Sequence, residues 1–204
     1  MRGWIYDRLM TNLFGGWYTA VLNRLPKGAL LLDVGIGTAG SLSRNADLVR
    51  DRDIHVVGVD IDGDYLRHAQ TNLTKAGLLD RVRLRHISIF EFQEREFDAA
   101  YFSASFMLMP EPERLLKHVH SLLKPGGSLY FTQTFQDKRS PLVEKVKPML
   151  HKVTTIHFGQ VTYEEDFFRT LAAAGFEATE HVRLGGNNQQ SFRLIAASPK
   201  VQVV

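Results

Sequence analysis

The sequence predicts an α/β protein built on a mostly parallel sheet. Short apolar runs rich in β-branched and aromatic residues alternate with longer segments of helical spacing. Such alternation is typical of a parallel sheet whose strands are joined by helices. The last two apolar runs are separated only by the polar, glycine-rich segment 185–190, which predicts an antiparallel hairpin at one edge of the sheet.

Seven strands and several covering helices are expected. The strands are predicted at residues 30–34, 55–59, 82–87, 97–102, 128–134, 176–184 and 191–197, and the covering helices at 64–76, 113–123 and 163–174. Each helix ends at a glycine or at Pro-Gly-Gly, which are ordinary stop signals. An apolar stripe over residues 4–25, interrupted by Gly15-Gly16, predicts a helical segment packed across the sheet, with a membrane-surface helix as the alternative.

Composition favours a single domain over residues 1–204, with a helical cap at 1–27 and a core at 28–198. The 204 residues are 44% hydrophobic and 23% charged, which is enough for one sizeable core. A net charge of +3 is too small to indicate a nucleic-acid-binding surface. No secretory leader or apolar span is visible, so a cytoplasmic location is expected. The absence of cysteine excludes disulfides, zinc-thiolate sites and thiolate nucleophiles.

The glycine-rich segment after the first strand predicts a site for an adenosine-containing ligand. Gly35, Gly37 and Gly40 have GxGxxG spacing, and Asp60 ends the next strand twenty residues later. Glycines let the backbone approach a ligand closely, and a carboxylate at this position can accept hydrogen bonds from ribose hydroxyls. Asp33 would repel a pyrophosphate at this loop and would instead favour a cationic amino-acid ligand.

These residues resemble the class I S-adenosylmethionine-dependent methyltransferases. The motif Asp-Val-Gly-x-Gly-Thr-Gly is matched at 33–39 except for Ala39, and the resemblance continues through Val59-Asp60, Phe97-Asp98 and Leu122-Leu123-Lys124-Pro125-Gly126-Gly127. Within the class, the chain is most similar to the ubiquinone/menaquinone-methyltransferase-like group of small-molecule enzymes. The resemblance covers about residues 28–198. It implies a Rossmann-like three-layer sandwich, a seven-stranded sheet with an antiparallel C-terminal hairpin, and an N-terminal helix over the cofactor site.

The resemblance implies S-adenosylmethionine as cofactor, S-adenosylhomocysteine as product, and no metal. The residues it assigns to the cofactor are Tyr6, Asp33, Gly35, Gly37, Thr38, Asp60, Ile61, Ser88, Ile89 and Ser103. In this assignment Asp33 serves the methionyl part, Asp60 the ribose and Ile61 the adenine. Ser88 stands where the family commonly has Asp, and a plain turn residue is the alternative. Tyr6 lies in the apolar stripe, where a core position is the alternative.

The acceptor is expected over the carboxyl ends of the strands. The residues predicted to bind it are Trp17, Phe106, Met107, Gln133 and Asn187. Their mixture of apolar and neutral polar groups favours a small or medium organic molecule. His157 and Tyr163 are the candidate general bases, with a surface histidine and a helix start as the alternatives. The accepting atom is left open between oxygen, nitrogen, sulfur and carbon.

The expected function is therefore methyl transfer to a small molecule by a monomer or homodimer without a nucleic-acid partner. Three other functions stay open: an RNA or protein methyltransferase, an inactive cofactor-binding partner subunit, and an NAD(P)-dependent oxidoreductase. Arg81, Arg83 and Arg85 alternate along one strand. They suggest either a phosphate site or a solvated edge strand, and the edge strand is favoured.

Overall fold

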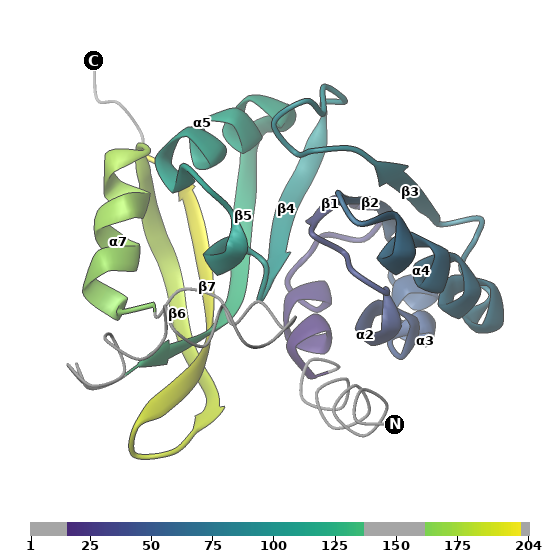
Figure 1. Cartoon of the computed structure of the whole chain (residues 1–204), viewed down its shortest axis with the longest axis horizontal. Coiled ribbons are helices and arrows are strands. Elements are labelled where there is room, and N and C mark those ends of the chain that lie inside the picture. Colours follow the sequence, from purple (N-terminus) through teal and green to yellow (C-terminus); the bar gives the residue numbers. More distant parts are fainter. Residues whose placement is uncertain (1–15, 137–161, 201–204) are drawn as a thin grey trace.

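The computed structural model describes residues 16–136 and 162–200, which contain a seven-stranded sheet in the order β3-β2-β1-β4-β5-β7-β6 (Figure 1). The strands are β1 (Leu30–Val34), β2 (His55–Asp60), β3 (Val82–His86), β4 (Phe97–Ser103), β5 (Leu123–Gln136), β6 (Phe176–Gly186) and β7 (Gln190–Pro199). β1 to β5 pair in parallel, whereas β7 runs antiparallel to both β5 and β6. The predicted parallel sheet with a C-terminal hairpin is confirmed.

Helices lie on both faces of this sheet. They are α2 (Gly40–Ser43), α3 (Ala46–Asp51), α4 (Gly63–Ala76), η1 (Phe106–Leu108), α5 (Pro112–Leu122) and α7 (Glu164–Ala173), and residues 16–22 are also helical. Figure 1 shows α7 beside β6 and α4 beside β3, at opposite ends of the sheet. The Asp62 carboxylate caps α4 by accepting from the amides of Asp64 and Tyr65, and Gly77 ends it with a φ of +64°.

The two faces of the sheet bury separate apolar cores. One core packs α5, α7 and η1 against residues such as Leu32, Val34, Ala100, Phe102, Leu129, Phe131 and Ile195. The other packs residues 18–25 and helices α3 and α4 against residues such as Leu31, Val56, Ala99, Tyr101, Tyr130 and Leu194. Successive residues of one strand alternate between these cores, because side chains of a strand point to opposite faces. The sheet is therefore the middle of three layers, as predicted.

The start of β5 differs from the prediction. The sequence predicts a helix to residue 123 and a strand from 128, but the helix ends at Leu122 and the strand begins at Leu123. Leu123 pairs with Phe97, and the register with β4 then shifts before Ala99 pairs with Ser128. The Pro-Gly-Gly segment, predicted to lie between the helix and the strand, therefore lies inside the strand as an irregularity. Gly126 has a φ of +81°, which glycine adopts without strain.

The arginine-rich segment lies at the edge of the sheet, as predicted. β3 is an outer strand, and both Arg83 and Arg85 pair with Glu94, at 3.1 and 2.8 Å. Arg81 pairs with Asp53 at 2.6 Å. These carboxylates offset part of the cationic charge of this segment, which favours the edge-strand interpretation over a phosphate site.

Residues 16–136 and 162–200 contain neither a candidate membrane span nor a candidate metal-ion site. No helix there combines the length and apolarity needed to cross a membrane. The same residues contain no group of three or more His, Asp or Glu side chains placed to hold a metal ion.

Candidate functional site

The candidate site lies at the carboxyl ends of β1, β2 and β4, where the predicted glycine loop leaves β1. The amides of Gly35 and Ile36 both donate to the Val59 carbonyl, at 2.9 and 3.2 Å, which fixes the loop to β2. Gly35 has a φ of +76°, and a Cβ there would lie 2.7 Å from the Cβ of Ser105. Ser105 in turn donates from its hydroxyl to the Val34 carbonyl. Glycine at position 35 is therefore required by both conformation and space.

Asp60 connects the end of β2 to this loop. Its Oδ2 accepts from the Gly37 amide at 2.8 Å, and its Oδ1 accepts from the Asp62 amide at 2.9 Å. A carboxylate can accept about four hydrogen bonds, so each oxygen retains acceptor capacity. The Asp60 side chain thus braces the glycine loop and can also accept hydroxyl donors, as the predicted ribose contact requires.

Asp33 is completely buried on β1 and has one unsatisfied oxygen. Its Oδ2 accepts from the Tyr18 hydroxyl at 2.8 Å, whereas Oδ1 has no hydrogen-bond partner within residues 16–136 and 162–200. Burial raises the pKa of Asp33 to about 7; the Tyr18 hydrogen bond lowers it, and nearby Asp60 raises it. A buried carboxylate oxygen without a partner favours a cationic or hydrogen-bonding ligand.

Tyr18 is a site residue that the sequence analysis missed. It lies in the N-terminal helical segment, and its ring meets Tyr101 edge-on at 5.0 Å between centroids. Burial and the nearby Asp33 carboxylate raise the pKa of Tyr18 well above its ordinary value, so its hydroxyl stays protonated and donates. Tyr101 shares a 2.6 Å hydrogen bond with Thr132 of β5. A tyrosine in an apolar stripe generally needs a polar partner, and that was the available signal.

The predicted adenine side forms a neighbouring part of the same edge. Ile61 follows β2 and is 75% exposed, which leaves a large apolar surface uncovered. The Ile87 amide donates to the Asp60 carbonyl at 3.1 Å, so the turn at Ser88 starts beside Ile61. The Ser88 hydroxyl accepts from the Phe90 amide at 3.3 Å and thus serves the turn. The Ile89 side chain is buried in the core. The predicted contact of Ile89 with the cofactor would therefore be made by its backbone.

Thr38 and Ala39 complete the loop that leads into α2. The Asn72 side chain of α4 donates to the Thr38 carbonyl at 2.9 Å and holds the loop from the side. Ala39, which departs from the family motif, has a φ of +51° in the left-handed region. Glycine is preferred in that region, and the family motif has glycine at this position. Ala39 therefore adopts the left-handed conformation that the motif glycine would have.

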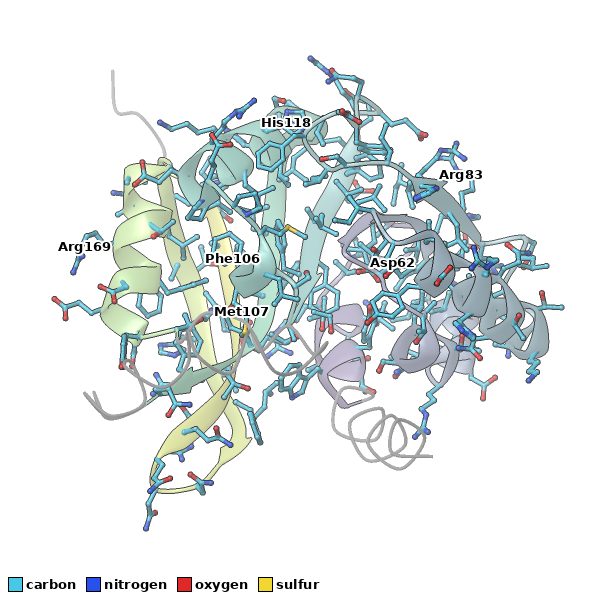
Figure 2. All side chains as sticks on the ribbon, viewed as in Figure 1. Asp62, Arg83, Phe106, Met107, His118 and Arg169 are labelled. Carbon is cyan, nitrogen blue, oxygen red and sulfur yellow. The ribbon has the colours of Figure 1, made fainter. Side chains whose placement is uncertain are left out.

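Several residues predicted to meet the acceptor lie farther along the edge. Met107 is partly exposed on η1, and Figure 2 shows it next to Phe106 and well away from Asp62 at the start of α4. Phe106 is only 7% exposed, because its ring packs against Phe131 and other core rings. Trp17 is also buried, with its ring 5.8 Å from that of Phe192. The structure therefore places Phe106 mainly in a packing role, and Trp17 beside Phe192 of β7.

The remaining predicted residues lie in different parts of the chain. Gln133 is buried on β5, near the carboxyl edge. Asn187 holds the β6–β7 turn, because its Oδ1 accepts from the amides of Gln189 and Gln190 at 2.8 and 3.0 Å. Tyr163 directly precedes α7, and the neighbouring Thr162 carbonyl accepts from the amide at the end of β5. Tyr6 and His157 lie outside the described residues.

This arrangement suits a ligand with a cationic group, hydroxyls and an apolar ring. The buried oxygen of Asp33, the Asp60 carboxylate and the exposed Ile61 supply the matching surfaces in that order. All three stand where β1 and β2 end, and Ser103 ends β4 on the other side of β1. The predicted cofactor residues among those described are thus brought to one edge of the sheet.

The sequence of the chain is similar to that of known methyltransferases. Residues 31–127 match the methyltransferase domain family. The ubiquinone/menaquinone biosynthesis C-methyltransferase UbiE of Brucella canis is 26% identical over 175 residues, covering 76% of this chain and 64% of that protein. The chain therefore spans somewhat less than two thirds of the length of the curated relatives it matches. These matches confirm the resemblance inferred from the motifs.

Solved structures share the fold. The [4+2]-cyclase SpnF superposes with a TM-score of 0.72 at 22% identity, covering 96% of this chain and 82% of its own. A geranyl diphosphate C-methyltransferase from Streptomyces coelicolor gives a TM-score of 0.70 at 15% identity, covering 91% and 76%. A methyltransferase from Thiobacillus denitrificans in complex with S-adenosylhomocysteine gives 0.69 at 15% identity, covering 92% and 91%. At these identities the likeness establishes the fold alone.

Proposed function

From the methyltransferase-domain match over residues 31–127, we propose that this chain binds S-adenosylmethionine and transfers its methyl group to a small or medium organic molecule. The observation that carries the cofactor assignment is the buried, unpartnered Oδ1 of Asp33 beside the glycine loop. When bound, this cofactor supplies an electrophilic methyl group on a sulfonium sulfur. The names of the Brucella relatives and of the superposed methyltransferases support a small-molecule acceptor.

The residues of the edge have separate roles in this proposal. Asp33 holds the cationic amino group of the cofactor, and Tyr18 orients that carboxylate from the opposite side. Asp60 accepts from the ribose hydroxyls while bracing Gly37, and Ile61 packs on the adenine. Aligning two reactants in this way removes much of the entropic part of the barrier to a bimolecular displacement. The whole chain acts as one domain, with Tyr163 and His157 as the candidate bases.

The first experiment is calorimetric titration with S-adenosylhomocysteine. We expect micromolar binding to the wild type and at least a tenfold weaker affinity in Asp60→Ala, because the ribose acceptor is lost. Asp64→Ala is the matched control, since Asp64 is exposed and its carboxylate pairs with Arg67 on the surface of α4. Circular dichroism checks that all three proteins are folded. Absence of binding to the wild type would contradict the proposal.

A second experiment identifies the acceptor class. S-adenosylmethionine labelled in its methyl group is incubated with the protein and a cell extract, and the label is followed into small-molecule, RNA and protein fractions. Label in the extractable small molecules is the expected result. Label in RNA or protein would instead establish a macromolecular methyltransferase. Cofactor binding without any labelled product, together with co-purification of a second chain, would favour an inactive partner subunit. Stronger thermal protection by NADH than by S-adenosylhomocysteine would favour an oxidoreductase.

A further inference from the structure

Gln133 is a buried amide with no partner in the described protein. It lies on β5, three residues before the strand ends at Gln136, and is only 1% exposed. Neither its Oε1 nor its Nε2 has a hydrogen-bond partner within residues 16–136 and 162–200. Buried polar groups are nearly always hydrogen-bonded, and leaving one unpaired costs free energy. An unpaired donor and acceptor on one side chain therefore need an explanation.

The surroundings of Gln133 make this side chain more suited to a ligand than to a structural role. Phe131 and Phe135 lie two residues away on either side, so all three residues share one face of β5. Both phenylalanines belong to the apolar core that includes Phe167. A side chain chosen for stability at this position would be apolar, because an apolar side chain would leave no polar atom unpaired.

The register of the sheet places Gln133 next to the proposed methyl-transfer position. Thr132 pairs with Ser103 at the end of β4, and the Thr132 carbonyl accepts from the Ala104 amide at 2.8 Å. The resemblance to class I methyltransferases implies that Ser103 lies beside the methionyl part of the cofactor and its transferable methyl group. Gln133 is therefore the next residue toward the carboxyl edge on the strand that follows β4 in the sheet. Ligands of open α/β sheets bind at this edge.

Within residues 16–136 and 162–200, the charged register partner of Gln133 is already paired with a carboxylate. Arg193 of β7 is its register partner, and the Arg193 guanidinium pairs with Glu164 at 2.7 Å. The same guanidinium lies near the Nε2 of His181, at 2.9 Å, and over the Phe135 ring. A carboxylate or phosphate on a substrate is usually recognised by a cation that is not already neutralised. The register neighbour of Gln133 instead provides a cation whose charge is matched by Glu164.

We propose that Gln133 selects a neutral methyl acceptor that carries a hydrogen-bond donor and acceptor side by side on an otherwise apolar frame. The amide oxygen accepts from the acceptor's hydroxyl or N–H, and the amide nitrogen donates to its carbonyl. A hydroxyl next to a carboxamide or ketone is the matching group. This inference rests on the proposed function, since it defines which molecule is methylated at that site.

The test uses two probes that differ only in the group next to the hydroxyl, a neutral carboxamide in 3-hydroxy-2-naphthamide and a carboxylate in 3-hydroxy-2-naphthoate. Each is titrated into the wild type saturated with S-adenosylhomocysteine. We expect the neutral amide to bind at least tenfold more tightly than the carboxylate. Equal binding, tighter binding of the carboxylate, or no binding of either probe would overturn the inferred acceptor class.

The variant Gln133→Leu provides an independent readout. Removing an unpaired buried amide should raise Tm by roughly 2–4 °C while reducing the affinity for the naphthamide at least tenfold. Gln136→Leu is the matched control, because Gln136 points to the other face and its Nε2 donates to Gln190 Oε1 at 3.5 Å. That variant should keep the preference for the amide. A lower Tm in Gln133→Leu would show that the amide is structural and would overturn the inference.

The two proposals fail in distinguishable ways. If the wild type does not bind S-adenosylhomocysteine, the proposed methyltransferase function fails. If it binds normally but shows no preference for the naphthamide, only the assignment of Gln133 fails.

Discussion

The burial of Asp33 predicts a specific dependence of stability on pH. Its pKa is about 7 in the folded chain, against an ordinary value of 3.8, so between these values the folded state binds more protons than the unfolded state. The stabilisation is fully present below about pH 4 and is lost as the pH rises through about 7. One pKa unit corresponds to about 1.4 kcal/mol, so the full effect is ~4 kcal/mol. About 3 kcal/mol of it is lost between pH 5 and pH 8.

Asp33→Asn removes this titration and serves as the reference. The free energy of unfolding is measured by urea denaturation of both proteins at several values from pH 5 to pH 8. The wild type should lose about 3 kcal/mol relative to the variant over this range. The change with pH is the decisive quantity, because the new amide nitrogen also alters the absolute stability. Parallel pH profiles for the two proteins would refute the reasoning.

The same carboxyl group should make cofactor binding pH-dependent. A cationic amino group binds the ionised form of Asp33, which is about a tenth of the population at pH 6 and about nine tenths at pH 8. The affinity for S-adenosylhomocysteine should therefore increase about tenfold between these values, and calorimetry measures it directly. Asp33→Asn should bind weakly with little pH dependence. An unchanged wild-type affinity over this range would mean that the ligand does not contact Asp33.

Three further substitutions test other parts of the edge. Gly35→Ala should lower the free energy of unfolding by about 2 kcal/mol or more and weaken cofactor binding, because its Cβ would lie 2.7 Å from that of Ser105 and φ is positive. Tyr18→Phe leaves the Asp33 carboxyl group without its hydrogen bond, and should cost about 1–3 kcal/mol by urea denaturation. Ile61→Ser should weaken S-adenosylhomocysteine binding in calorimetry while changing stability by less than about 0.5 kcal/mol.

Each of these substitutions has a control in the same region. Gly37→Ala adds a methyl group where nothing lies within 4 Å, so its cost should be limited to the positive φ of +58°. Tyr65→Phe removes a hydroxyl from an exposed ring, and Leu79→Ser changes another exposed apolar residue. Both should leave stability and cofactor affinity nearly unchanged. If Leu79→Ser weakened binding as much as Ile61→Ser, the assignment of Ile61 to the adenine would be wrong.

Periodicity predicted most of the fold because it reports which side of each element is buried. Alternating apolar runs located every strand, and glycine located the ends of the helices at 76 and 173 within one residue. The start of β5 was wrong because Leu123 belongs equally well to the apolar face of a helix. Only its pairing with Phe97, distant in the sequence, places it in the strand.

The site was less predictable because motifs identify backbone requirements better than side-chain contacts. The glycine loop and Asp60 follow from close backbone approach, and the structure brings them together. The helical stripe predicted that residues 4–25 pack across the sheet, but it did not predict that Tyr18 reaches Asp33. Phe106 was expected to line a pocket, and it packs mainly in the core instead. Apolar character alone does not separate a pocket wall from a core residue.

The order of the strands gives the two halves of the edge different electrostatic characters. Asp33 is the next-to-last residue of β1 and Asp60 the last of the neighbouring β2, and the Asp60 charge contributes to the raised pKa of Asp33. A cationic ligand offsets both the repulsion from Asp60 and the free-energy cost of burying the Asp33 charge, so this half of the edge favours cations. On the far side of β4, Gln133 is uncharged and Arg193 is balanced by Glu164. Ser103 ends the strand between these halves, where a cationic methyl donor and a neutral acceptor would meet.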